Sequence, residues 1–150
     1  MRHAGLETAF SLRMEKGYIA RFDFMDGVTP FEAGMGWTVK LDKGDFIGRA
    51  ALAQQRAEGV QRKLVSVAMD DDTLPAGGCP ILHKDAVVGK ITSSAHGYSA
   101  GCPLALALIS ADLAQPGLPV EVEVEGHRHA AHIVRRPFYD PEGKRLRPEG

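Results

Sequence analysis

From residue 62 onward, apolar and polar residues alternate with a period of two, and Gly or Pro interrupts the alternation at short intervals. Residues 120–124, Val-Glu-Val-Glu-Val, predict a half-buried strand with a solvated acidic face. The apolar run at 104–109 predicts a buried strand. Further strands are predicted at 63–69, 80–82, 87–92 and 128–134. About six short strands favour a small closed antiparallel barrel, because closure leaves no exposed sheet edge.

Residues 1–60 have a different pattern, of mixed helix and loop. A helix is predicted over residues 6–15, and Gly17 stands where a helix C-cap glycine is expected. Leu6, Phe10 and Arg13 are spaced to share one face of this helix. Arg13 is therefore the polar member of an apolar stripe. It either extends from the edge of the core into solvent or is held to bind an anion.

Two helix-start signals and one alternating stretch follow. Thr29 and Glu32 have the spacing of a capping box, and Pro30 suits a first helical position, so a short helix is predicted with Glu32 bound to backbone donors. Residues 37–41 alternate and predict a strand. Residues 46–59 predict a second helix.

The composition excludes several classes of protein. The chain has 18 Lys and Arg against 19 Asp and Glu, a net charge of −1, which argues against a nucleic-acid partner. It has no apolar run of membrane-spanning length and no apolar signal-peptide core at its start. Cys79 and Cys102 form no CxxC pair, so a reducing, cytoplasmic setting is expected.

No complete catalytic or metal site is evident from spacing alone. His127 and His129 would share one strand face and His132 the other, so we expect a surface hairpin and no metal site. The segment 93–102 holds hydroxyls, His96 and Cys102. It lacks the Gly-x-Ser-x-Gly elbow and an acidic orienting residue, so it is interpreted as a glycine-rich connection between strands.

Four segments nevertheless resemble one family. They are Ser-Leu-Arg-Met-Glu-Lys-Gly-Tyr at 11–18, Thr-Pro-Phe-Glu-Ala-Gly-Met-Gly-Trp at 29–37, Val-Lys-Leu-Asp-Lys-Gly-Asp-Phe-Ile-Gly-Arg at 39–49, and a set spread over 88–93, 104–107 and 136–139. Their order and content resemble the C-terminal part of the glycine-cleavage T-protein (aminomethyltransferase) family. That family includes the folate-binding halves of dimethylglycine and sarcosine dehydrogenases.

The resemblance implies an α+β chain with two parts and a tail. Residues 1–60 would be a short helical and loop fragment, the last part of the folate-binding domain. Residues 61–139 would be the family's C-terminal domain, a small antiparallel six-stranded Greek-key β-barrel. Residues 140–150 would be a polar tail.

The resemblance also implies the cofactor and its contacts. The Arg of the Leu-Arg segment contacts tetrahydrofolate in the family, and the matching residue here is Arg13. A guanidinium there would form charge-assisted hydrogen bonds with a carboxylate or a polar pterin edge. Glu15, Tyr18 and Trp37 lie in matching segments and are expected to line the same cavity.

The family's catalytic acid precedes the Leu-Arg segment, so no catalytic residue is assigned in this chain. Asp23, Asp26, Asp42 and Asp45 do not match that motif. We expect part of a tetrahydrofolate-dependent aminomethyltransferase that takes a one-carbon unit from an amine donor, with an N-terminal catalytic region, a lipoyl carrier protein or a flavin dehydrogenase subunit as partner. The alternative is a non-catalytic barrel that docks onto such a partner, which sedimentation would test.

Overall fold

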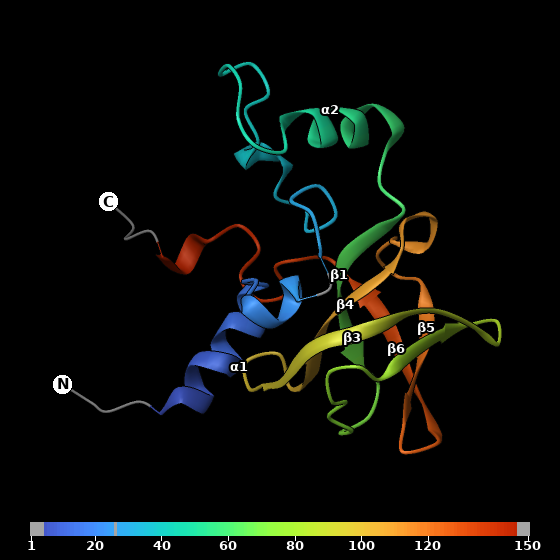
Figure 1. The fold of residues 1–150 in the computed structure, drawn as a ribbon. Helices are drawn as coiled ribbons and strands as arrows, with labels where there is room; N and C mark the ends of the chain where they lie inside the picture. Colours follow the sequence, from blue (N-terminus) through green and yellow to red (C-terminus); the bar gives the residue numbers. More distant parts are fainter. Residues whose placement is uncertain (1–4, 26, 147–150) are drawn as a thin grey trace.

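The structure is a computed structural model that describes residues 5–25 and 27–146. Two α-helices and six strands form its framework (Figure 1). The helices are α1 (Leu6–Lys16) and α2 (Arg49–Glu58), and the strands are β1 (Arg62–Met69), β2 (Pro80–His83), β3 (Ala86–Gly97), β4 (Cys102–Ser110), β5 (Pro119–Val124) and β6 (His127–Val134). Short 3-10 helices occur at η1 (Arg21–Phe24), η2 (Gly36–Thr38), η3 (Ala111–Leu113) and η4 (Lys144–Leu146).

The six strands close into the barrel that the alternation predicted. Their order around the barrel is β1-β4-β3-β2-β5-β6, and every neighbouring pair is antiparallel. Strands β2, β3 and β4 follow one another as neighbours, and β5 returns to lie beside β2. This is a Greek-key arrangement. The predicted α+β fold with a six-stranded barrel is confirmed.

The barrel has an inner core and an outer apolar layer. Alternate residues point inward, among them Val67, Ile81 and Ile133, and these are almost completely buried. The opposite faces of β1 and β4 carry Leu64 and Leu106, which pack beneath α1 rather than inside the barrel. Strand β4 is therefore buried on both faces, which explains its continuous apolar sequence.

Helix α1 ends where the sequence predicted, but it turns a different face to the barrel. Gly17 adopts a left-handed conformation and caps the helix. The buried residues of α1 are Ser11, Met14 and Glu15, whereas Leu6 is 74% exposed. Phe10 and Arg13 do share one face, since the guanidinium stands over the Phe10 ring, but this face lines a pocket and is not the face buried against the barrel. On the buried face, Ser11 and Glu15 form hydrogen bonds to the backbone of the β3–β4 region.

The segment between α1 and β1 also differs from its predictions. Residues 30–34 form a turn and not a helix. The predicted strand at 37–41 is wrong, since η2 and a second turn occupy this stretch. Helix α2 begins at Arg49, buries no residue and lies apart from the barrel (Figure 1). None of the described helices is long and apolar enough to cross a membrane.

Residues beyond β6 return to α1. The backbone N–H groups of Phe138 and Tyr139 donate to the Glu15 carbonyl, and Lys16 forms an ion pair with Asp140. The predicted tail therefore begins with residues fixed against the helix. Its last four positions, 147–150, lie outside the described residues.

The predicted capping box is present and is tied to the barrel. Glu32 accepts a hydrogen bond from the Thr29 N–H, the Thr29 hydroxyl accepts from the Glu32 N–H, and Arg62 of β1 pairs with the buried Glu32 carboxylate at 3.0 Å. Burial alone would raise the pKa of Glu32, but the hydrogen bonds from Thr29 and Arg62 outweigh it and lower the pKa below its ordinary value.

This ion pair predicts an acid-dependent stability. Because the folded-state pKa is lowered, the contribution of Glu32 is complete above the unfolded-state pKa and is lost as the pH falls through the folded-state value. Glu32→Gln should lower the free energy of unfolding by about 1 kcal/mol at neutral pH, since Arg62 is partly exposed. Thermal melts from neutral to acidic pH should show this difference shrinking. Exposed Glu58→Gln is the control, and a pH-independent difference for Glu32→Gln would contradict the prediction.

Candidate functional site

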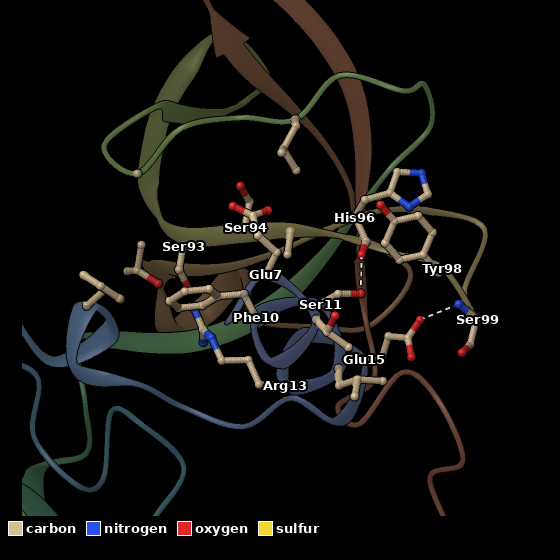
Figure 2. Close-up of a pocket in the computed structure, with 17 residues that line it drawn as sticks. Glu7, Phe10, Ser11, Arg13, Glu15, Ser93, Ser94, His96, Tyr98 and Ser99 are labelled. Atoms are coloured by element: carbon tan, nitrogen blue, oxygen red, sulfur yellow. Dashed lines mark hydrogen bonds between the residues drawn. The ribbon is translucent and has the colours of Figure 1, made fainter. Parts of the chain in front are cut away.

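A pocket of about 760 Å³ lies between α1 and β3 (Figure 2). One wall is the face of α1 that carries Phe10 and Arg13, and the other is β3 at residues 92–96. The β1–β2 loop adds Leu74 and Gly77, and η1 adds Phe22. A pocket of this volume is large enough for a cofactor-sized organic molecule. We call it the α1–β3 pocket.

Arg13 lies in the wall of this pocket and is largely withdrawn from solvent, with 12% of its side chain exposed. Its Nη1 donates to the Tyr18 carbonyl at 3.1 Å and to the Asp23 carboxylate at 3.2 Å. Its guanidinium stands 5.6 Å from the centre of the Phe10 ring. Its Nε is buried and has no acceptor among the described residues. The guanidinium is thus fixed through Nη1, and its Nε donor is unused among the described residues.

Asp23 is the residue of this site that the sequence analysis did not identify. It is completely buried in η1, and its carboxylate accepts from Arg13, from the Ala20 N–H, and from the hydroxyls of Thr92 and Ser93 on β3. The two hydroxyls lie some 70 positions away in the sequence, so no local spacing marks the cluster. The one available signal is an acidic residue between the aromatic residues of Arg-Phe-Asp-Phe.

Glu15 lines the same pocket, but the backbone occupies its carboxylate. Glu15 Oε1 accepts hydrogen bonds from the N–H groups of Ser99 at 2.5 Å and Ala100 at 3.3 Å, and the side chain is almost fully buried. Figure 2 shows the first of these bonds. The carboxylate thereby fastens α1 to the loop after β3. These contacts are structural, and they hold the pocket wall that carries Arg13.

Tyr18 and Trp37 line a second hollow of about 360 Å³, not the α1–β3 pocket. Among the described residues, Arg13 and Glu15 thus line one pocket and Tyr18 and Trp37 line another, and a shared role of the four residues in folate binding stays a prediction. Both aromatic side chains are mostly exposed there, beside Arg136. The Arg136 stem lies against Gly17 and its Nη2 lies beside Gly34, where it donates to the Ala33 carbonyl. Burial lowers the pKa of Arg136, and Asp23 opposes that effect.

The remaining motifs are tied to the barrel. Residues 93–97 belong to β3, so only 98–101 connect β3 to β4, and the predicted connection is shorter than expected. His129 and His132 bind Asp71 and Asp70 of the β1–β2 loop, at 2.8 and 2.7 Å. No group of three or more metal-binding side chains converges within residues 5–25 and 27–146. Burial raises the pKa of the Cys102 thiol, which suits a packed cysteine rather than a nucleophile.

Three comparisons place this architecture among known proteins. The sequence model of the glycine cleavage T-protein C-terminal barrel domain matches residues 62–140. An aminomethyltransferase from Nostoc sp. PCC 7120 is 42% identical over 142 residues, which cover 93% of this chain and 38% of that protein. An aminomethyltransferase from Synechocystis sp. PCC 6803 is 39% identical with the same coverage.

A solved structure shows the same fold. The crystal structure of glycine cleavage system aminomethyltransferase T from Bartonella henselae superposes with a TM-score of 0.82 at 24% identity, over 88% of this chain and 38% of that one. The chain thus spans less than two fifths of the relatives it matches. The barrel match and the identity across the helical segment together show that the chain belongs to the glycine-cleavage T-protein family.

Proposed function

We propose that this chain forms one side of a tetrahydrofolate site in an aminomethyltransferase-type protein. The observation that carries the proposal is Arg13, a cation with only 12% of its side chain exposed, in the wall of the α1–β3 pocket, whose Nε lacks an acceptor among the described residues. When bound, tetrahydrofolate accepts the one-carbon unit from an amine donor at its N5. Arg13 would hold a carboxylate or a pterin oxygen of that molecule.

The pocket meets the chemical needs of tetrahydrofolate at three points. Its volume of about 760 Å³ accommodates a molecule of that size. Phe10 and Phe22, whose ring centres lie 6.4 Å apart, offer apolar surface to a flat ring. Arg13 supplies positive charge where a glutamate tail or an oxygen needs a donor. The residues present therefore fit the group.

The role proposed for this chain is binding, not proton transfer. Asp23 and Glu15, the buried carboxylates at the pocket, are bonded to Arg13, hydroxyls and backbone N–H groups. We therefore assign them no acid–base step. In this proposal the catalytic acid comes from a further region, and the donor is presented by a lipoyl carrier protein or a flavin dehydrogenase subunit. Residues 1–60 belong with the folate side of the site, and residues 61–139 with the barrel that supports it.

Titration calorimetry with tetrahydrofolate tests the proposal. The unaltered chain should bind with saturation at a single site, and Arg13→Ala should weaken binding by about 10-fold or more, because charge-assisted hydrogen bonds contribute about 1.5–3 kcal/mol. The affinity of Arg13→Lys should lie between the two, since lysine keeps the charge and loses the planar fork.

A matched control separates a specific contact from a general charge effect. Arg21 lies nearby on η1, is exposed and does not line the pocket. Arg21→Ala removes the same charge and should leave the dissociation constant within about twofold. Equal losses for Arg13→Ala and Arg21→Ala would refute a site at Arg13, and a lack of saturable binding by the unaltered chain would refute the proposed function.

A further inference from the structure

Asp23 is the most highly connected carboxylate of the described chain. It is 0% exposed, and both of its oxygens are in use. Oδ2 accepts from the Ala20 N–H at 2.8 Å and from Arg13 Nη1 at 3.2 Å. Oδ1 accepts from the hydroxyls of Thr92 at 2.5 Å and Ser93 at 2.6 Å. One carboxylate therefore joins η1, α1 and β3 at the wall of the α1–β3 pocket.

The direction of these bonds determines how the pocket can bind a ligand. A carboxylate only accepts hydrogen bonds, so the Ser93 hydroxyl hydrogen points at Asp23, and the Thr92 hydroxyl hydrogen does so in preference to the Leu106 carbonyl, which is farther away at 3.1 Å. The oxygens of Thr92 and Ser93, which line the pocket, consequently retain only lone pairs for other partners. On the other side, Asp23 occupies Nη1 of Arg13 and leaves Nε and Nη2 as donors. Asp23 thus sets a donor on one wall and acceptors on the other.

We propose that Asp23 is a positioning residue of this site: it orients Arg13 and fixes the hydrogen-bond polarity of Ser93, so that the pocket selects a ligand carrying an anionic or carbonyl oxygen together with an N–H donor. Tetrahydrofolate has both, in its carboxylates and in the N–H groups of its reduced pterin ring. The inference rests on the proposed function for the identity of the ligand. The link between Asp23 and Arg13 stands on the geometry alone.

Asparagine at this position cannot reproduce the arrangement. An amide presents one acceptor and one donor group. If its NH₂ takes the place of Oδ2, it faces the N–H donors of Ala20 and Arg13, and these hydrogen bonds are lost. If its NH₂ faces Ser93 and Thr92, the hydroxyls must reverse and direct their hydrogens elsewhere. Asp23→Asn therefore either releases Arg13 or inverts the polarity of the opposite wall, and either change weakens binding.

A double-mutant cycle tests whether Asp23 acts through the binding residues. The proteins are the unaltered chain, Asp23→Asn, Arg13→Ala and the double variant, each titrated with tetrahydrofolate. Asp23→Asn should weaken binding about 10-fold when Arg13 is present and less than about threefold in the Arg13→Ala background. Equal losses in both backgrounds would overturn the positioning role while leaving the proposed function intact.

A second readout needs no ligand. The NMR signal of the Arg13 Nε–H should be a single, slowly exchanging resonance in the unaltered chain, and it should shift and exchange faster in Asp23→Asn. An unchanged signal would overturn the inference even if tetrahydrofolate fails to bind, whereas failure of binding with a changed signal would refute only the proposed ligand.

A control variant and a second variant of the Asp23 cluster complete the test. Glu32 is also a buried carboxylate paired with an arginine, but it lies outside the pocket, so Glu32→Gln should leave the dissociation constant and the Arg13 signal unchanged. If Asp23→Asn does not fold, Thr92→Val removes one hydrogen bond to Oδ1 with little change of shape. It should weaken binding severalfold, and this loss should again disappear without Arg13.

Discussion

Gly89→Ala is expected to destabilise the barrel by about 3 kcal/mol, at the upper end of the cost of overpacking a core. Gly89 lies on β3 between Ile81 of β2 and Ile109 of β4. A Cβ at this position would clash with the Leu108 carbonyl oxygen and would stand 2.7 Å from the Ile109 Cα. These are backbone atoms of a central strand, so no flexible side chain can move aside. Two strands of a closed barrel must separate, or the hydrogen-bond ladder must shift.

The measurement is a thermal melt followed by circular dichroism, with urea unfolding for the free energy. A loss of about 3 kcal/mol corresponds to a fall of roughly 10 °C in Tm for a chain of this size. Gly126→Ala is the matched control, because Gly126 has a φ of +80° and open space around its Cα. It should cost about 1–2 kcal/mol from backbone strain alone. If Gly89→Ala costs no more than this control, the close approach of β4 is not what requires glycine.

The barrel could be predicted from the sequence because its signal is local. Each strand carries its own alternation, and turn residues such as Lys84 and Asp85, both with positive φ, mark where the chain reverses. Closure then follows from the need to protect edges. The stretch 37–41 shows the limit of this reasoning. It alternates as a strand does, but no described strand lies beside it, and a strand without a hydrogen-bonded neighbour is not stable.

The pocket could be predicted only in part, because its partners are distant in the sequence. Arg13 was identified through a segment resemblance, and the structure places it in a pocket wall. The Asp23 cluster was missed because Thr92 and Ser93 reach it only after the barrel forms. The buried face of α1 was assigned wrongly for the same reason. The surface that covers Met14 is built from β1 and β4, which no periodicity within α1 can reveal.

Met14 supports the second large prediction, because it is the apolar anchor of α1. It is 2% exposed and packs against Leu64, Ala68, Leu104 and Leu106 on the outer faces of β1 and β4. Several other attachments of α1 are polar, such as the Ser11 hydroxyl donating to the His96 carbonyl at 2.7 Å. Met14→Ala leaves a cavity between helix and barrel, and such changes cost about 2–5 kcal/mol.

The loss of stability in Met14→Ala should appear first in α1, because the inner barrel core does not include Met14. Hydrogen exchange of the α1 amides should accelerate by about 30-fold or more, while the barrel amides remain protected. Leu12→Ala on the same helix is the control for stability, since Leu12 is 56% exposed and the substitution should change the free energy of unfolding by no more than about 0.5 kcal/mol.

Because α1 forms one wall of the α1–β3 pocket, undocking the helix should weaken tetrahydrofolate binding in proportion to the undocked population. Unchanged exchange in α1 would show that Glu15 and the residues after β6 hold the helix without its apolar anchor.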